Sequence, residues 1–324
     1  MPVRSTYEHA PAAVERTGGQ GMSGLQADAD DLRSGYFIRG QFFSAPSLSS
    51  GLYIVATPIG NLGDITLRAL DTLAGADLLA CEDTRVTRKL LARYGIETKV
   101  TAYHDHSGPD AHRRLLGHLA DGRSVALVSD AGTPLISDPG YRLVVDAAAA
   151  GYPVVPIPGA SSASAALSAA GLPTDAVLFL GFAPSKSAAR RKRLEDVARI
   201  PATLAFFESP NRAGALLADA VAVLGGERQA VICREITKLH ETFDRGPLAE
   251  LAARYCDAAV KGEIVVIIAP PGPPAPPADA DVEAQLRAAL HSMSIKEAAQ
   301  FVAETTGFSR RDLYQKALAI KGAG

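Results

Sequence analysis

The stretch VALVSDAGTPLISDPG (residues 125–140) places a short apolar run directly before a turn of small residues, prolines and two carboxylates. Its apolar part, residues 125–128, is typical of a buried parallel strand. Because ligands bind at the carboxyl ends of strands in open α/β sheets, we expect the turn to form part of a ligand site. Small residues would let a ligand lie against the backbone, and carboxylates can take hydroxyl or ammonium protons. The turn has no Lys and no GxxxxGK[ST] pattern, so it is not built for a triphosphate.

Two further strand-to-loop junctions have the same composition. Residues 52–56 (LYIVA) lead into TPIGNLGD at 57–64, and residues 154–157 (VVPI) lead into PGASS at 158–162, before an Ala/Leu/Ser run suited to a helix. Three junctions of one type predict one crevice lined by three loops. The alternative is three ordinary βα turns, since Gly, Pro and Ser occur in turns of every kind.

Composition limits the class of protein. The chain has 324 residues and a formal net charge of −2, which allows roughly two domains of ~150 residues each. The longest apolar run, residues 264–269, is far shorter than the ~20 residues of a membrane span, and no secretory signal is visible. The cysteines (Cys81, Cys233 and Cys256) are widely spaced, which predicts reduced thiols, no metal site and a cytoplasmic location. The net charge is close to zero, so the protein as a whole lacks the basic character of many nucleic-acid-binding proteins. Any RNA contact would therefore be made by a local basic patch.

Apolar runs and helical patterns alternate between residues 51 and 171, which predicts a mostly parallel sheet with helices on both faces. Residues 176–270 read as a second α/β unit, whose last three strands follow one another so quickly that part of its sheet is expected to be antiparallel. The expected organisation is a disordered leader at 1–47, an N-terminal α/β domain at 48–172, a second α/β domain at 173–270, a Pro-rich linker at 271–281, and a helical tail domain at 282–324.

Two helices are predicted in the tail. Ser294 and Glu297 form a capping box, and residues 306–308 form the turn before a second helix that starts with Arg310 and Arg311. This pattern resembles a helix-turn-helix, although a plain helical hairpin fits the composition equally well. The cluster at residues 190–193 (RRKR) and the arginines of the tail are candidate RNA patches or solvated helix faces.

Three polar segments place opposite charges side by side at strand ends: CEDTR at 81–85, FESPNR at 207–212 and REITKLHE at 234–241. If they meet in an interdomain cleft, they supply cations for phosphate and carboxylates for ribose hydroxyls. The alternative is a set of structural ion pairs between the domains.

These segments carry a family resemblance. VATPIGNLGDIT (55–66), CEDTRVTRKLL (81–91), SDAGTPLISDPG (129–140), PGASSA (158–163), FESPNR, REITKLHE and KGEIVVII (261–268) follow in order. Together they resemble the tetrapyrrole methylase superfamily, and within it the ribosomal small-subunit methyltransferase I branch. The match covers about 51–270, and the tail resembles the C-terminal helix-turn-helix domain of that branch.

The resemblance implies an α/β fold of two tetrapyrrole-methylase domains with the cofactor in the cleft between them, plus the small helical domain. It implies a cytoplasmic homodimer, without a membrane partner, that uses S-adenosylmethionine to methylate the ribose 2′-oxygen of a decoding-centre cytidine in 16S rRNA of the small subunit. Ser129 stands where the superfamily has the first Gly of its cofactor loop. The residues that would line the cofactor are Pro58, Ile59, Asp130, Gly132, Thr133, Ser161, Ser162 and Phe207.

Methyl transfer to a hydroxyl needs in-line alignment and a group that takes the proton or stabilises the developing charge. The candidates are Glu82, Asp83, Glu208, Lys238 and His104, while Arg85 and Arg212 are expected to hold phosphate. His104 lies in a His-rich stretch, residues 103–107, like one found in the branch. The competing functions are a tetrapyrrole C-methyltransferase, a non-catalytic ribosome-binding module and a nucleotide-phosphate enzyme. The charged segments and the basic tail count against the first.

Overall fold

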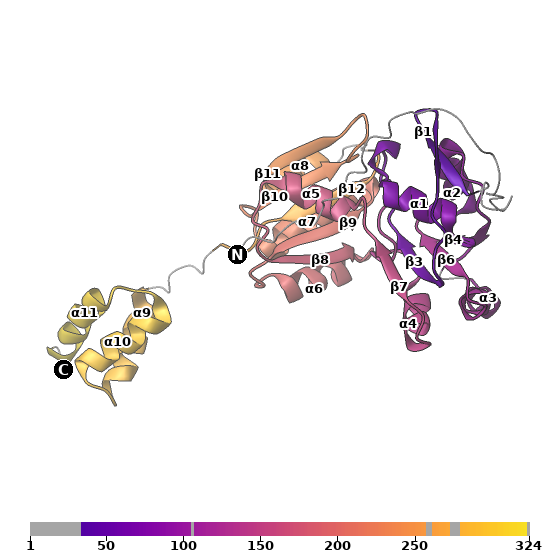
Figure 1. The fold of residues 1–324 in the computed structure, drawn as a ribbon. Helices are drawn as coiled ribbons and strands as arrows, with labels where there is room; N and C mark the ends of the chain where they lie inside the picture. The colour runs from indigo at the N-terminus through magenta and orange to yellow at the C-terminus, as the bar shows by residue number, and fades with distance from the viewer. Residues whose placement is uncertain (1–33, 105–106, 257–260, 273–278, 323–324) are drawn as a thin grey trace, which may run out of the picture.

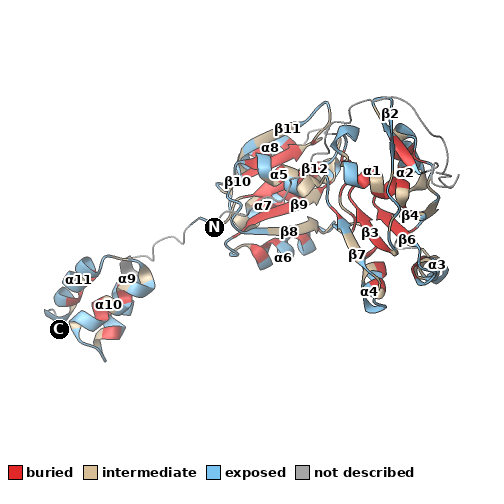
Figure 2. Ribbon diagram, viewed as in Figure 1, coloured by how far each residue is buried: buried red, intermediate tan, exposed pale blue. Residues whose placement is uncertain are grey.

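Two five-stranded sheets follow one another along the chain, and a group of three helices follows them (Figure 1). The computed structural model describes residues 34–104, 107–256, 261–272 and 279–322. Figure 2 shows that the central strands of both sheets are buried. Within the described ranges, no helix combines the length and apolar character needed to span a membrane.

The first sheet is entirely parallel, as predicted, in the order β5-β4-β6-β3-β7. Every residue of β3 and β6 is buried, because both faces of the sheet are covered by helices. Consecutive side chains point to opposite faces, so Tyr53 and Val55 join one apolar cluster, and Leu52 and Ile54 join another. The strands are β3 (Gly51–Val55), β4 (Leu78–Cys81), β5 (Val100–Ala102), β6 (Ser124–Val128) and β7 (Val154–Ile157).

Helices cover this sheet on both faces, which confirms the prediction. The cluster with Val55 includes side chains of α1 (Leu67–Gly75) and α2 (Thr84–Tyr94). The cluster with Leu52 includes side chains of α3 (Pro109–Ala120) and α4 (Tyr141–Ala149).

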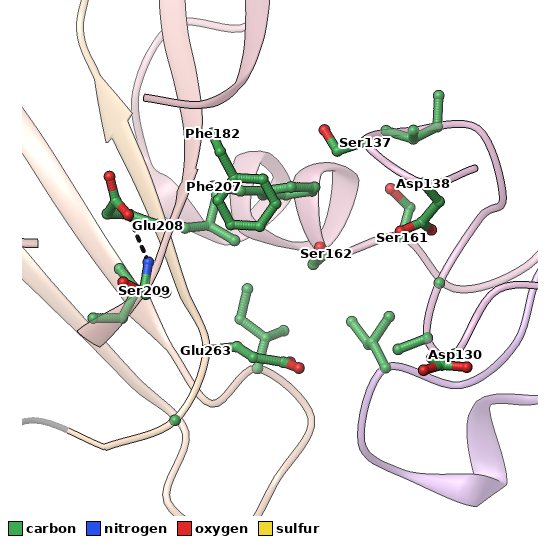
Figure 3. Close-up of a pocket in the computed structure, with 18 of the residues that line it drawn as sticks. Asp130, Ser137, Asp138, Ser161, Ser162, Phe182, Phe207, Glu208, Ser209 and Glu263 are labelled. Atoms are coloured by element: carbon green, nitrogen blue, oxygen red, sulfur yellow. Dashed lines mark hydrogen bonds between the residues drawn. The ribbon is translucent and has the colours of Figure 1, made fainter. Parts of the chain in front are cut away.

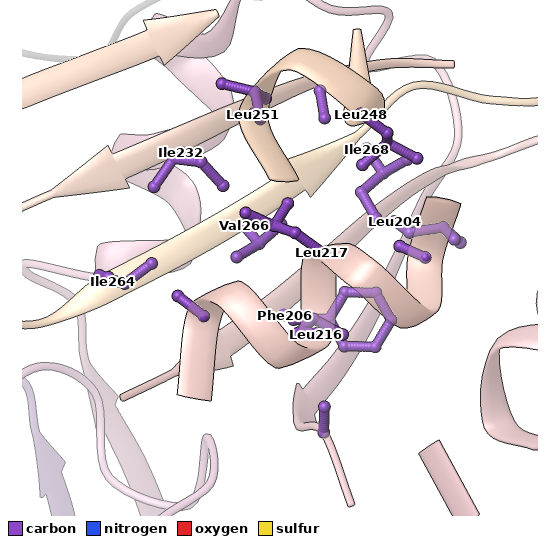
Figure 4. Close-up of a cluster of buried hydrophobic side chains, with 14 of the residues drawn as sticks. Leu204, Phe206, Leu216, Leu217, Ile232, Leu248, Leu251, Ile264, Val266 and Ile268 are labelled. Atoms are coloured by element: carbon purple, nitrogen blue, oxygen red, sulfur yellow. The ribbon is translucent and has the colours of Figure 1, made fainter. Parts of the chain in front are cut away.

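The second sheet has the order β11-β10-β12-β9-β8 and is mixed. Only β8 and β9 are parallel, and the other neighbours are antiparallel, as the close spacing of the last strands predicted. Its helices α6, α7 and α8 lie over one face, around the apolar cluster drawn in Figure 4. The elements are β8 (Val177–Phe182), α6 (Ser187–Val197), β9 (Thr203–Glu208), α7 (Pro210–Leu224), β10 (Gln229–Arg234), β11 (Thr242–Pro247), α8 (Leu248–Tyr255) and β12 (Ile264–Ile268).

Helix α5 (Ser162–Ala170) covers the opposite face of the second sheet, although it directly follows a strand of the first. Its Ala166 and Ala170 share a buried cluster with Val231 and Val265. The expected boundary at residue 172 therefore assigns α5 to the wrong sheet. The periodicity of an Ala-rich helix reveals that it has an apolar face but not which sheet the face will meet.

A hairpin precedes the first sheet and corrects the predicted leader, which was expected to be disordered up to residue 47. Strands β1 (Gly35–Ile38) and β2 (Gln41–Ser44) pair antiparallel across a turn whose central residues, Arg39 and Gly40, both have positive φ. This is the requirement of a type I′ turn. Tyr36 is 3% exposed and donates a hydrogen bond to Asp71 Oδ1 at 2.9 Å, so packing on α1 orders the segment. Residues 1–33 lie outside the described residues.

The tail contains three helices rather than the predicted two: α9 (Asp279–Leu290), α10 (Ile295–Thr306) and α11 (Arg310–Gly322). Val282 and Leu286 of α9 are fully buried in one apolar cluster with α10 and α11, so α9 forms part of their core. The capping box of Ser294 and Glu297 is confirmed, and Gly307 ends α10 in the left-handed conformation. Part of the predicted linker, residues 273–278, lies outside the described residues.

Candidate active site between the two sheets

A cavity of about 380 Å³ lies between the loops of the first sheet and the strand ends of the second (Figure 3). The three loops predicted to share a crevice do meet here, represented by Ile59, by the turn around Gly132, and by Ser161 with Ser162. The opposite wall comes from the ends of β8 and β9 and the start of β12. Its lining side chains include Phe182, Phe207, Glu208, Glu263 and Val265.

The turn after β6 is held by a short bridge to the loop after β3. Thr57 N–H donates to Gly132 O at 2.8 Å, and Gly132 N–H donates to Thr57 O at 3.0 Å. Gly132 has φ +82°, and a Cβ added there would lie 3.3 Å from Ile59 Cγ2. Leu135 and Ser137 in the same turn also have positive φ, which non-glycine residues seldom adopt. Residues with a strained backbone are common at binding sites. The surrounding structure holds them in this conformation because it gives the site its shape.

Glu208 is a buried carboxylate that lines the cavity. Its side chain is fully buried, and its Oε1 accepts a hydrogen bond from Ser209 N–H at 2.8 Å. The same oxygen lies 3.3 Å from Arg212 Nε. Glu208 Oε2 has no hydrogen-bond partner among the described residues. A buried carboxylate oxygen without a partner is costly, so a site that keeps one is expected to offer it to a ligand.

Asp138 is a second cavity carboxylate, and the sequence interpretation did not select it. Its pKa is raised to about 6, mainly by burial and also by the nearby charges of Glu82 and Asp130, against a lowering hydrogen bond from Ser129. The residue belongs to the turn from which Asp130, Gly132 and Thr133 were selected. Glu263 was missed in the same way, because its segment was quoted for the resemblance without a role.

The raised pKa of Asp138 predicts a pH-dependent stability. The folded protein keeps this proton up to about pH 6, whereas the unfolded chain releases it near 3.8, so stability falls as pH rises through this window and stays lower above it. Asp138→Asn removes the free-energy cost of burying the carboxylate charge. We expect the variant to be more stable than the parent by about 1–2 kcal/mol near pH 7.5, after allowance for solvent screening, and no more stable below about pH 4. Urea unfolding at both pH values measures this, and an equal gain at both would contradict it.

Several predicted catalytic residues lie outside the cavity lining. Asp83 caps the start of α2, and its own backbone N–H donates to Asp130 Oδ1 at 2.9 Å. Arg85 pairs with Asp83 at 2.6 Å and leaves 85% of its side chain exposed. Glu82 is exposed and adds its charge to that around Asp138. This segment contacts the turn after β6 through the Asp83 N–H and Asp130, and its charged residues do not line the cavity, contrary to the prediction.

The other predicted cations are also engaged by protein groups. Arg212 contacts Glu208 and donates to Ala183 O. Lys238 lies 2.9 Å from Glu235 and 3.2 Å from Glu263, so it approaches the cavity only through the latter carboxylate. These pairs agree with the alternative of structural ion pairs, because each cation already has a carboxylate partner.

Two remaining predicted segments have mixed outcomes. Pro58 lines a separate slot with Thr57 rather than the main cavity. Of the His-rich stretch, His104 is described and does not line the cavity, whereas residues 105–106 lie outside the described residues.

The basic cluster at residues 190–193 is largely used inside the protein. Arg190 is buried and pairs with Asp219 at 2.6 Å, and Arg191 pairs with the same carboxylate at 2.6 Å. Lys192 pairs with Asp196 at 3.0 Å. The cluster therefore anchors α6 to α7 and offers fewer free charges to RNA than its sequence indicates.

Comparison with known proteins places this architecture. Residues 51–252 match the family described as Tetrapyrrole (Corrin/Porphyrin) Methylases, and residues 276–321 match the RsmI C-terminal HTH domain. The chain is 52% identical over 280 residues to a ribosomal RNA small subunit methyltransferase I of Mesorhizobium japonicum, covering 86% of this chain and 94% of that protein. It is 46% identical over 286 residues to the protein of that name from Escherichia coli O157:H7, covering 87% and 99%.

Solved structures share the fold at low sequence identity. A cobalt precorrin-4 methyltransferase aligns with a TM-score of 0.53 at 19% identity, covering 67% of this chain and 94% of that one. A diphthine synthase aligns with a TM-score of 0.51 at 17% identity, covering 67% and 89%. The two-sheet arrangement is therefore common to proteins with quite different names.

Proposed function

Because this chain belongs to the tetrapyrrole methylase family, as a member of its ribosomal RNA small subunit methyltransferase I group, we propose that it methylates the ribose 2′-oxygen of a decoding-centre cytidine in 16S rRNA. The family membership itself makes the protein an S-adenosylmethionine-dependent rRNA methyltransferase. The choice of a ribose hydroxyl is supported by Glu208, a cavity-lining residue whose buried Oε2 has no hydrogen-bond partner among the described residues and can take a proton.

The cavity fits S-adenosylmethionine by size and by chemistry. Its volume of about 380 Å³ lies within the range of small-molecule sites. The proposed contacts are the backbone around Gly132, the hydroxyls of Thr133, Ser161 and Ser162, the side chains of Ile59 and Phe207, and the Asp130 carboxylate. When bound, this cofactor supplies a methyl group on a sulfonium, which is already strongly electrophilic.

The protein therefore has to align the hydroxyl and accept its proton. In this proposal, Glu208 Oε2 would accept the hydroxyl proton, and the methyl group would pass from the cofactor sulfur to the ribose oxygen, with S-adenosylhomocysteine as the other product. Arg212 and Ser209 N–H hold the other carboxylate oxygen and so fix the direction of the acceptor. Because these groups are already in place, they need not reorient during the reaction. Such preorganisation is a major source of rate enhancement in enzyme active sites.

A cytoplasmic homodimer is part of the same proposal, since the motifs resemble a branch that forms one. Sedimentation of the purified protein measures the dimer. If the protein is a monomer and is fully active on small subunits, the homodimer proposal is wrong and the methyl-transfer proposal is unaffected.

The decisive experiment is methyl transfer from labelled S-adenosylmethionine to small subunits from cells lacking this gene, with a tetrapyrrole precursor in parallel. We expect label in 16S rRNA at one cytidine, with resistance to alkaline cleavage at that position. Such resistance identifies ribose 2′-O-methylation, because cleavage requires a free 2′-hydroxyl. Label on the base, or in the tetrapyrrole alone, would overturn the proposal. Cofactor binding without any transfer would favour the ribosome-binding module.

A further inference from the structure

Helix α2 carries four cations and no acid between Thr84 and Tyr94. Arg85, Lys89 and Arg93 recur every four residues, so they form a stripe along one side of the helix. Arg85 is held by Asp83, but Lys89 and Arg93 are exposed, and no ion pair joins them to another described residue. The stripe is about 12 Å long, which matches about three phosphates along one nucleic-acid strand.

The stripe borders a slot of about 180 Å³. Side chains of Pro58, Leu62, Val86 and Leu90 supply its apolar lining, and Lys89 also borders it. The volume is below the range of sites for larger ligands, so the slot suits a single ring system rather than a whole cofactor. Thr87 also lines the slot, and its buried hydroxyl lies beside the Cys81 thiol.

The slot and the main cavity share one residue, Asp130, which lines both. Asp130 also fixes the start of α2, because its Oδ1 accepts the Asp83 N–H at 2.9 Å. A strand that follows α2 toward its N-terminus is therefore led to the cavity where methyl transfer is proposed.

We propose that α2 is the face on which the rRNA substrate docks: Lys89 and Arg93 bind its phosphates, and the adjoining slot holds one of its bases. This inference rests on the proposed function for the identity of the polyanion. The observations favour RNA because the stripe has the sign and spacing for a phosphate backbone, and single-stranded RNA offers bases that can leave the stack.

The test compares Lys89→Gln/Arg93→Gln with Arg193→Gln/Arg199→Gln, which removes two exposed arginines from α6 and the turn after it. Affinity for a 16S rRNA fragment is measured against salt concentration. The α2 variant should reduce the slope of log K against log salt by about 1.4, since each lost phosphate contact on a single strand removes about 0.7. The control variant should keep the parent slope. An unchanged slope in the α2 variant, or an equal fall in both, overturns the docking face.

The slot is tested separately by filling it. Val86→Trp adds bulk to its wall, and Val145→Trp on α4 is the control, because the two valines are 39% and 44% exposed. We expect Val86→Trp to raise the KM for small subunits about tenfold with the salt slope unchanged, since it removes a base contact and no charge. An unchanged KM overturns the role of the slot.

Failure of this inference is distinguishable from failure of the proposed function. Cofactor affinity is measured in every variant and should not change, because neither Lys89 nor Arg93 lines the main cavity. If the parent methylates the 2′-oxygen while the α2 variant keeps its slope, only the docking face fails. If the slope falls but the parent transfers no methyl group to rRNA, only the proposed function fails.

Discussion

Glu208→Gln should lower the rate of methyl transfer at saturating substrates by about 100-fold to 10,000-fold, the usual contribution of a positioned proton acceptor. The amide has nearly the shape of the carboxylate but is not basic, so it cannot take the hydroxyl proton. The cofactor affinity should stay within about twofold, because the proposed cofactor contacts lie mainly on the loops of the first sheet. Single-turnover transfer to small subunits and a cofactor titration measure the two quantities.

Folding has to be separated from chemistry in this experiment, because the substitution leaves Arg212 beside a neutral side chain. Glu208→Asp is the matched variant, since it keeps the charge and withdraws the carboxylate by one methylene group. We expect it to recover part of the lost rate. Full activity of Glu208→Gln would exclude Glu208 as the proton acceptor. Loss of cofactor binding in a folded variant would place Glu208 in cofactor binding instead.

Gly132→Val should weaken cofactor binding by about 100-fold or more, equivalent to about 3 kcal/mol. Gly132 has φ +82°, where a β-branched residue is strongly disfavoured. The added side chain would also press on Ile59 Cγ2, 3.3 Å from the Cβ position, and so disturb two of the loops that line the cavity. Isothermal titration with S-adenosylmethionine measures the effect.

Gly151→Val provides a control with the same backbone requirement. Gly151 also has φ +82°, but it lies just beyond α4 and a Cβ there would meet nothing within 4 Å. We expect both variants to lose stability from backbone strain and only Gly132→Val to lose the cofactor. Equal cofactor affinity in the two variants would show that the shape of the turn at Gly132 is not part of the cofactor site.

Much of the fold could be predicted from local pattern. The strands of the first sheet stood out because each is a short apolar run between helical patterns, and Val125–Val128 is buried on both faces as such a run requires. The antiparallel pairing of β10 with β11 followed from the short spacing between 230–233 and 242–243. These features depend on neighbours in sequence, which is why the sequence reveals them.

The features that were missed depend on contacts between distant residues. The turn at Arg39 lacks the usual Asn or Asp, and Tyr36 is held by Asp71 on α1 and by an apolar cluster of residues distant in sequence. Likewise, Arg85 and Lys238 have the side chains of a phosphate site, but nearby carboxylates hold both. Charge along a sequence does not reveal which cation will find a partner, so the predicted catalytic set was broader than the cavity lining.

The position of α5 has a consequence for how the protein unfolds. A chain cut at residue 172 would leave an Ala-rich helix exposed on one fragment and would uncover Val231, Cys233 and Val265 on the other. Neither half could then hide its apolar surface alone, so each half depends on the other for its own free energy of folding. Denaturation of residues 51–270 should accordingly be a single cooperative transition rather than two.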